Sequence, residues 1–296
     1  MRTCVIFNPT AKGEKANRFG QHLEQIARES TLKMTAAPAD ARRLAAEAVE
    51  EGFEIIVAAG GDGTVNEVLN GLGDAPKGTE RARLGVLPLG TVNVFARELA
   101  LPSELMLAWD VIRRGRETQI DLPTVEFTSC GSRHKRLFVQ LAGAGLDARA
   151  IELVRWDLKK KLGPFAYVIA GFHALSGPLS LITATDDKHS ANGELILIGN
   201  GRLYGGDFRI FPKADLRDGL LEVCVFPRVN WFTLARCGPS LLIRGELPST
   251  IAHTFQAHSL TLTGASTGAL EVDGELIGHL PATFSVAPSG LRVIVP

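Results

Sequence analysis

The first 120 or so residues alternate between short apolar runs and longer segments with helical periodicity. Four runs are typical of buried strands, at residues 4–8, 32–36, 54–60 and 84–90. Helices are expected between and after them, at 14–29, from Asp40, at about 64–72, and from about Val92 and Ser103. In the segment from Asp40, one face carries Ala41, Leu44, Ala45, Ala48 and Val49. This alternation predicts a parallel sheet with helices on both faces.

The pattern changes after about Leu122, where strand-like runs predominate. They read LFVQLAG, LSLITAT, ELILIGNG, LLEVCVF, SLTLTG, ALEVDG, ATFSVAP and LRVIVP, with turn signals at Asn192-Gly193, Asp218-Gly219 and Asp273-Gly274. Helical patterns occur here at 149–175 and 230–244. We therefore expect an α/β domain at 1–123 and a mainly antiparallel β domain at 124–289. Whether the last strand, 290–296, returns to the first domain is left open.

Composition excludes several classes of protein. Apolar residues make up 45% of the chain and charged residues 22%, which is ordinary for a folded protein. The formal net charge is zero, so we expect no nucleic acid partner, and we interpret the basic run Arg133 to Arg136 as a solvated face. Cysteines without CxxC spacing predict neither a disulfide framework nor a zinc site. The apolar stretch 165–184 is broken at Gly177-Pro178, which favours a cytoplasmic protein over a membrane span.

A glycine-rich loop, GGDGTVNEVLNGL, follows the third predicted strand. Ligands of open α/β sheets bind where strands end and helices begin, and a helix N-terminus stabilises a phosphate. Gly60, Gly61 and Gly63 would let the backbone approach such an anion. Asp62 would repel a bare phosphate, so its place there indicates a bridging divalent cation or a hydroxyl nucleophile that the carboxylate orients.

A structural explanation of the same loop is also open, because Thr64 and Glu67 have the spacing of a helix capping box. The third glycine of the dinucleotide-binding fingerprint is missing, and the chain contains no GxxxxGK[ST] motif. A second loop, in LPLGTVNVFAREL at 87–99, again places Gly-Thr between a buried strand and a helix. Two such loops favour a phosphate site.

Several motifs in order along essentially the whole chain resemble the catalytic domain of the diacylglycerol kinase family, particularly the soluble bacterial lipid kinases related to sphingosine kinases. The motifs are NPTAKG, GGDGTVNEVLNGL with LGVLPLGTVNVFARELALP, KKKLGPFAYVIAGF, PKADLRDGLLEV and EVDGE. GGDGT alone is shared with phosphofructokinases and NAD kinases. The resemblance implies that ATP lies along the α/β domain and that the active site lies in the cleft between the two domains.

The resemblance also implies roles for individual residues. The expected ATP-binding residues are Asn8, Thr35, Gly61, Asp62, Gly63, Thr64, Val65, Asn66, Glu67 and Thr91. The expected magnesium ligands are Asp215, Asp218 and the carbonyl of Leu220, although the pattern alone also fits a plain Asp-Gly turn. Glu275 is the expected general base with Asp273 as a supporting carboxylate, and Asp62 is a rival for the same role.

The implied function is ATP-dependent transfer of the γ-phosphoryl group to a lipid hydroxyl, by default that of diacylglycerol. The chain departs from several members at Val94, where they carry aspartate, so a sphingoid base, a monoacylglycerol or phosphatidylglycerol stays open. The alternatives are a kinase for a soluble hydroxyl substrate, of the NAD kinase type, and a nucleotide-binding regulator without turnover. The segment RWDLKKKLGPF, 155–165, is expected to contact the inner face of the membrane transiently. A homodimer stays open.

Overall fold

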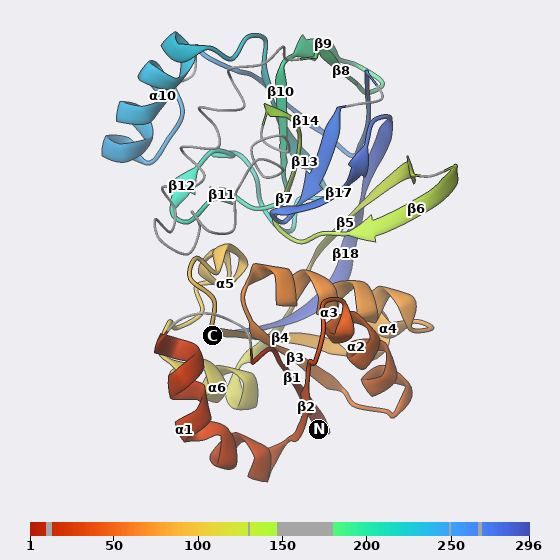
Figure 1. The fold of residues 1–296 in the computed structure, drawn as a ribbon, viewed down its shortest axis with the longest axis vertical. Helices are drawn as coiled ribbons and strands as arrows, with labels where there is room; N and C mark the ends of the chain where they lie inside the picture. Colours follow the sequence, from red (N-terminus) through yellow and green to blue (C-terminus); the bar gives the residue numbers. More distant parts are fainter. Residues whose placement is uncertain (10–13, 130, 147–179, 249, 266–267) are drawn as a thin grey trace.

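The computed structural model describes residues 1–9, 14–129, 131–146, 180–248, 250–265 and 268–296. These residues form two lobes, an α/β lobe below and a β-rich lobe above (Figure 1). The predicted helix at 149–175 and the basic segment at 155–165 lie outside the described residues. Within the described part of the chain, no helix is long and apolar enough to span a bilayer.

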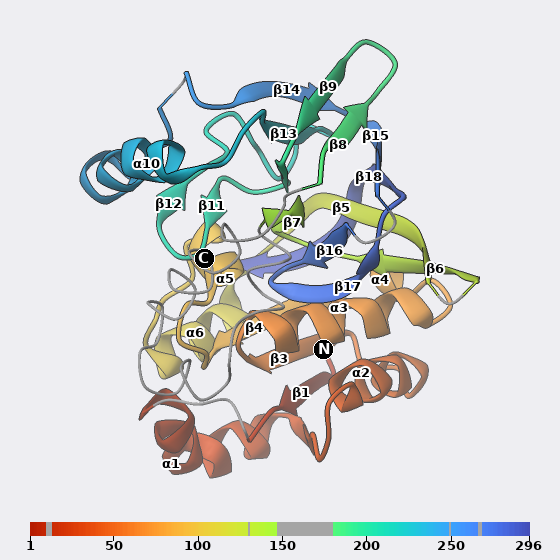
Figure 2. The ribbon, with the colours of Figure 1, turned by 45° about the horizontal axis from the view of Figure 1, so that its top comes forward.

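The lower lobe is built on a parallel sheet with the strand order β2-β1-β3-β4. The strands are β1 (Thr3–Phe7), β2 (Thr31–Met34), β3 (Ile55–Gly60) and β4 (Arg83–Pro88). Helices α1 (Glu14–Glu29) and α6 (Leu105–Arg114) lie on one face, and α2 (Asp40–Glu50) and α3 (Asp62–Asp74) on the other (Figures 1 and 2). The predicted parallel sheet with two covered faces is confirmed.

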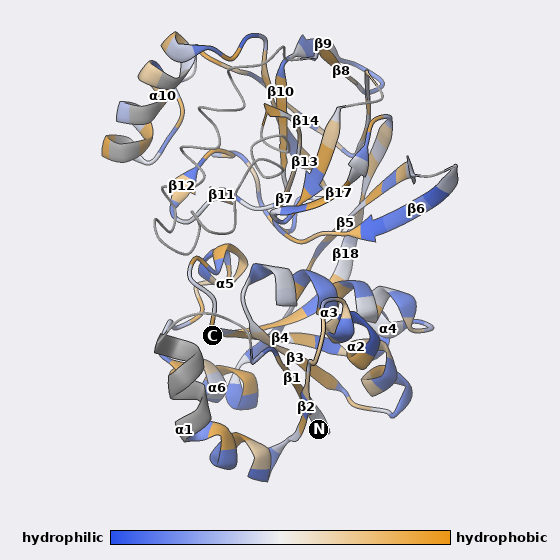
Figure 3. Cartoon of the chain, viewed as in Figure 1, coloured by the Kyte–Doolittle hydropathy of each residue, from blue (hydrophilic) through white to orange (hydrophobic). Residues whose placement is uncertain are grey.

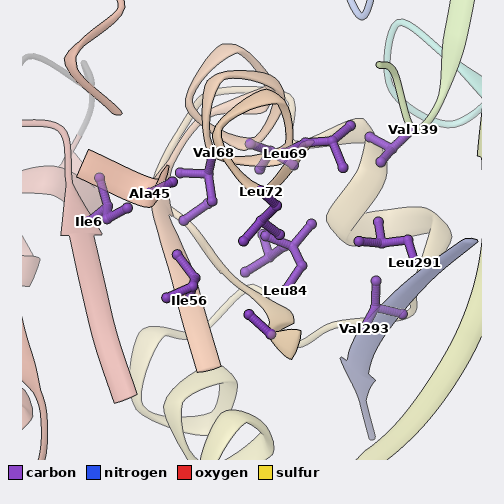
Figure 4. Close-up of a cluster of buried hydrophobic side chains, with 14 of the residues drawn as sticks. Ile6, Ala45, Ile56, Val68, Leu69, Leu72, Leu84, Val139, Leu291 and Val293 are labelled. Atoms are coloured by element: carbon purple, nitrogen blue, oxygen red, sulfur yellow. The ribbon is translucent and has the colours of Figure 1, made fainter. Parts of the chain in front are cut away.

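Both faces of this sheet carry an apolar core because successive strand residues point to opposite sides. On the side of α2 and α3, Ile6 and Ile56 meet Leu69 and Leu72 (Figure 4). The whole predicted stripe of α2 is buried there: Ala41, Leu44, Ala45, Ala48 and Val49. On the other side, Val57 packs in a cluster with Trp109 of α6. Two short helices, α4 (Gly78–Arg81) and α5 (Val94–Glu98), complete the lobe, and α4 was not predicted.

Two long antiparallel strands, β5 (Arg116–Ser129) and β18 (Ala282–Val295), run from one lobe into the other (Figure 1). The lower end of β18 lies beside β4, with Val293 paired to Leu84. Its upper part contributes Phe284 to the core of the β-rich lobe. ATFSVAP and LRVIVP were predicted as separate runs, but they form one strand with a register shift between Ala287 and Leu291. The lobes are therefore joined by continuous hydrogen-bonded strands.

The upper lobe contains two antiparallel layers. Strands β6 (Ser132–Leu137), β8 (Ile182–Thr185), β9 (Ser190–Gly193) and β15 (Ser259–Gly264) extend the sheet of β5 and β18. The second layer is β14-β13-β10-β7-β16-β17, comprising His253–Ala257, Leu221–Phe226, Leu195–Gly199, Leu141–Gly145, Ala269–Val272 and Glu275–His279. A small hairpin of β11 (Leu203–Tyr204) and β12 (Phe208–Arg209) and the helix α10 (Trp231–Arg244) lie outside these layers. The predicted helix at 230–244 is confirmed.

The predicted turn at Asn192-Gly193 is wrong. Both residues have extended backbone in β9, where Asn192 pairs with Thr183 and Gly193 with Ile182. The chain changes sheet one residue later, at Glu194. Gly193 is needed there because a Cβ atom would stand 2.6 Å from the carbonyl oxygen of Phe226.

Candidate active site

The glycine-rich loop lies between the end of β3 and the first turn of α3. Gly61 is the N-cap residue and α3 begins at Asp62, two residues earlier than predicted. Val65 N donates to Gly61 O at 3.1 Å, which is the first bond of the helix ladder. The N–H groups of Gly63 and Thr64 therefore point out of the N-terminus with no backbone acceptor inside the helix, and the N–H of Asp62 faces its own carboxylate. The partial positive charge at such a helix end suits a phosphate group.

The capping-box explanation of this loop is wrong. Because α3 begins at Asp62, Thr64 is the third residue of the helix and not its N-cap. The Glu67 carboxylate turns instead to the start of α2, where Ala39 N and Ala41 N each donate to it at 3.0 Å. No side chain of the cap residue closes the helix end. The N–H groups of Gly63 and Thr64 are therefore not taken up by a side chain of the cap residue.

The two Gly-Thr loops touch each other through their backbones. A Cβ atom on Gly90 would stand 2.6 Å from Gly61 Cα, so the approach requires glycine. Asn93 holds the second loop in shape, since its side chain bonds both the N–H and the carbonyl of Gly90, at 3.0 and 2.7 Å. Asp62 Oδ1 accepts a hydrogen bond from Phe95 N at 3.3 Å, which joins the first loop to α5. Burial raises the pKa of Asp62, and N–H donors at the start of α5 oppose that rise.

The other predicted nucleotide contacts lie at this same edge of the sheet. Asn8 follows β1, and its Nδ2 donates to Thr64 Oγ1 at 3.3 Å. Thr35 follows β2, and its N–H donates to Phe7 O at 2.9 Å. Thr91 is exposed in the second Gly-Thr loop. The structure thus brings Asn8 into contact with the glycine-rich loop and places Thr35 after β2 and Thr91 after β4, at the same edge of the sheet but with two strands between them.

Two predicted contacts, Val65 and Asn66, have side chains buried in protein. Val65 packs in the core beneath α3. Asn66 Nδ2 donates to Asp273 Oδ2 at 2.8 Å, which connects α3 to the upper lobe. The Asp273 carboxylate also accepts three backbone N–H groups at 3.0 to 3.2 Å, those of Val139, Gln140 and Leu141. Burial raises the pKa of Asp273, and its four N–H donors oppose that rise.

The tight turn predicted at Asp273-Gly274 is confirmed, with φ values of 47° and 82°. It connects β16 to β17, and Glu275 is the first residue of β17. Because Asp273 is held by four donors, the start of β17 has a fixed position above the N-terminus of α3. Asp273 therefore anchors the hairpin that carries Glu275.

Glu275 faces the glycine-rich loop directly. A Cβ atom on Gly63 would stand 2.8 Å from Glu275 Oε1. The other carboxylate oxygen, Oε2, lies 3.5 Å from Arg136 Nη2. Burial raises the pKa of Glu275 to about 7; Arg136 opposes the rise, and the charges of Glu67 and Asp273 add to it. A carboxylate with this pKa can accept a proton near neutral pH.

The predicted metal residues lie in the turn before β13. Asp218 Oδ1 accepts the Leu220 N–H at 2.9 Å, and Asp218 N donates to Asp215 O at 3.3 Å. Burial raises the pKa of Asp218, the Leu220 N–H opposes this, and the charges of Asp121 and Asp215 add to it. A hard divalent cation would relieve that mutual repulsion.

The fit to a cation is partial. No three His, Cys, Asp or Glu side chains meet as a metal site within the described ranges, so backbone carbonyls or water would have to complete the coordination. Buried Glu222 lies nearby, and its Oε1 meets no donor among the described residues. Such an orphaned acceptor is consistent with an additional polar partner at this turn.

Two residues at the site were missed by sequence reasoning. Arg136 belongs to a basic run that we interpreted as solvated, but β6 pairs with β5 and places Arg136 beside Glu275. Asp121 is buried, and its carboxylate accepts Gly219 N and Ser289 N at 2.6 and 3.0 Å. Nothing local in the sequence marks either residue, because each acts through strands distant along the chain.

An open helix N-terminus behind a glycine-rich loop, faced by a carboxylate that can take a proton, defines a phosphotransferase that acts on a hydroxyl group. Comparison with protein-family models identifies a diacylglycerol kinase catalytic domain at residues 2–125. A YegS C-terminal NAD kinase beta sandwich-like domain matches residues 140–295. The chain belongs to the diacylglycerol kinase family.

Individual relatives agree with this assignment. The diacylglycerol kinase of Staphylococcus saprophyticus is 33% identical over 305 aligned positions, covering 100% of this chain and 95% of the relative. The diacylglycerol kinase of Staphylococcus epidermidis is 34% identical, and the alignment covers 100% of this chain and 92% of the relative. A crystal structure of a diacylglycerol kinase from Bacillus anthracis is 22% identical and shares the fold, with a TM-score of 0.76, 100% of this chain covered and 97% of that one. The predicted family, its two-domain fold and its kinase class are confirmed.

Proposed function

We propose that the protein transfers the γ-phosphoryl group of ATP to the hydroxyl of a membrane lipid, with diacylglycerol as the first candidate. The observation that carries this proposal is the position of Glu275 over Gly63. The N–H groups at the start of α3 bind the phosphates, and the lipid hydroxyl approaches the γ-phosphate from the side, within reach of Glu275. The relatives named diacylglycerol kinases support the choice of acceptor.

These groups account for every bond and proton that changes in the reaction. The hydroxyl oxygen forms a bond to the γ-phosphorus, the bond from that phosphorus to the bridging oxygen breaks, and ADP leaves. Glu275 accepts the hydroxyl proton, which its pKa of about 7 allows at neutral pH. We assign Asp62 to joining the two Gly-Thr loops, since its carboxylate accepts the N–H of Phe95. Asp273 acts by positioning Glu275.

The nucleotide is proposed to lie along the strand ends of the lower lobe. Asn8, Thr35 and Thr91 offer side chains there, and Gly61, Asp62, Gly63 and Thr64 offer backbone N–H groups. Val65, Asn66 and Glu67 support the loop from within the protein, because their side chains are engaged by the core, by Asp273 and by α2. The domain division at residue 123 assigns 1–123 to ATP and 124–289 to the lipid.

A structural magnesium ion is proposed at the turn before β13, held by Asp215, Asp218 and the carbonyl of Leu220. It would neutralise carboxylates that repel one another and so stabilise the turn. We also propose a cytoplasmic enzyme that contacts the inner face of the membrane transiently.

Substrate class is tested with radiolabelled ATP and a panel of acceptors. Diacylglycerol, monoacylglycerol, phosphatidylglycerol and a sphingoid base are presented in mixed micelles, and glycerol and NAD in solution. The proposal expects label in a lipid product that the variant Glu275→Gln forms far more slowly than the wild type, whereas the control Glu126→Gln on β5 forms it at the normal rate. Label in NAD alone would show that the protein is a kinase for a soluble hydroxyl substrate. ATP binding without a labelled product from any acceptor would show that it is a nucleotide-binding regulator without turnover.

A further inference from the structure

Helix α10 carries apolar side chains on two opposite faces. Its inner face buries Cys237 and packs half-buried Leu241 against the core cluster below. Its outer face holds residues at helical spacing, Phe232, Ala235, Pro239 and Ile243, all of them exposed. Phe232 is 68% exposed and Ile243 82%.

This outer face departs from the pattern of a surface helix, which normally turns polar residues to solvent. Figures 1 and 2 both show α10 at the outer edge of the β-rich lobe, away from the sheets. Apolar stretches of the helix appear in orange in Figure 3. Trp231 at the first turn is also 58% exposed. Large apolar side chains exposed along one helix indicate an interaction surface.

The charges of the helix restrict what can cover this face. The sequence of α10 contains two arginines and no acidic residue, and Arg228 lies just before it. The guanidinium of Arg236 lies 5.7 Å from the centre of the Phe232 ring, so a positive charge stands beside the apolar face. Aromatic, aliphatic and basic side chains on one face are typical of a helix that lies in the headgroup region of an anionic bilayer.

A second copy of the chain fits this face less well. Contact about a two-fold axis would bring the same patch of each molecule together, and thus Arg236 toward the Arg236 of the other copy. Like charges at such a contact oppose association. An anionic lipid surface instead attracts Arg236 while the apolar side chains enter the boundary of the acyl chains.

We propose that α10 is the membrane-docking helix of this protein and that its outer face binds an anionic lipid surface. The proposal rests on the proposed function, because a kinase for a membrane lipid must reach a hydroxyl at the bilayer surface. It assigns docking to residues different from the segment 155–165 expected from the sequence.

The test is sedimentation with phosphatidylcholine vesicles, with and without phosphatidylglycerol. The variant Phe232→Glu/Ile243→Glu should bind the anionic vesicles about tenfold more weakly or worse, since it loses two apolar contacts and gains two repelled charges. Arg236→Gln should weaken binding about fivefold, and on the anionic vesicles only. Leu107→Glu on α6 is the matched control, because Leu107 is 55% exposed on the other lobe; binding should be unchanged.

Folding is checked by thermal melting and by phosphorylation of a short-chain, water-soluble diacylglycerol, both of which should match the wild type. Vesicle binding by Phe232→Glu/Ile243→Glu equal to that of the wild type would overturn the proposal. If the same variant kept its vesicle binding but lost a dimer that the wild type forms in analytical ultracentrifugation, the proposal would also be overturned. The outer face of α10 would then be a contact between two copies of the chain. Vesicle binding needs no turnover. A wild type that docks through α10 yet phosphorylates no lipid would refute the proposed function and leave the docking surface standing.

Discussion

Glu275 of the upper lobe lies so close to Gly63 of the lower lobe that a methyl group on Gly63 would stand 2.8 Å from Glu275 Oε1. The helix end that we propose to bind phosphate and the proposed proton acceptor therefore belong to different lobes and lie next to each other. Strands β5 and β18 run through both lobes and pair with each other, which connects the two parts of the site.

Gly63→Ala should lower turnover without destabilising the fold. The new methyl group would displace the end of the Glu275 side chain, while the helix gains up to about 1 kcal/mol in propensity. We expect kcat to fall about 100-fold, as for a misplaced catalytic group, with the melting temperature unchanged or higher. Steady-state kinetics and thermal melting check this. Wild-type kcat in the variant would show that Glu275 does not act from this position.

The pH dependence of kcat/KM should report Glu275. The base is active when deprotonated, so activity should fall as pH decreases through about 7, the pKa that burial gives Glu275. Arg136→Gln removes the positive charge that opposes the rise in the pKa of Glu275, so the acidic limb should move to higher pH. Arg136→Lys keeps that charge and should return the limb most of the way to its wild-type position. Arg133→Gln on the same strand is the control, since Arg133 is exposed and pairs with Glu126. An acidic limb that does not move in Arg136→Gln would contradict this assignment.

Asp273→Asn should weaken the connection between the lobes. In the wild type, three backbone N–H groups donate to the Asp273 carboxylate. The NH2 group of an asparagine cannot accept a hydrogen bond from them, so at least one buried donor is left unsatisfied. A loss of about 1–3 kcal/mol in the free energy of unfolding follows. Urea denaturation measures it, with Asp187→Asn in an exposed loop as the control. Equal stability of the variant and the wild type would show that the four hydrogen bonds do not anchor the hairpin.

The turn before β13 gives a prediction about magnesium. If Asp218 helps to hold the ion, magnesium should raise the melting temperature of the wild type, because it binds only the folded state. Asp218→Ala should abolish this shift, whereas Asp187→Ala should keep it. A magnesium-dependent shift of full size in Asp218→Ala would remove Asp218 from the ligands.

Local patterns were sufficient for the lower lobe. The stripe of α2 and the apolar run of β3 follow from periodicity and burial along a single segment, so both could be predicted from the sequence. The joining of residues 282–295 into one strand could not, because it depends on pairing with β5 and β4. Arg136 illustrates the same limit at the site. The four residues before it, Ser132 to Lys135, are exposed, and the pairing of β6 with β5 places Arg136 beside Glu275.

The glycine-rich loop shows how two explanations of one pattern are separated by geometry. Thr64 and Glu67 have the spacing of a capping box, yet the helix starts at Asp62 and Glu67 binds the start of α2. The spacing is a property of the local sequence, whereas the N-cap residue Gly61 packs against Gly90 of the second loop. That contact joins loops about thirty residues apart.

The most direct test of the account is phosphoryl transfer by Glu275→Gln. Single-turnover transfer from radiolabelled ATP to diacylglycerol in mixed micelles is measured at pH 8, with ATP affinity measured in parallel. Loss of the general base predicts a rate about 10²- to 10⁴-fold below the wild type, with ATP affinity and melting temperature retained. A rate within a few-fold of the wild type would contradict the assignment of Glu275 as the group that takes the proton from the lipid hydroxyl.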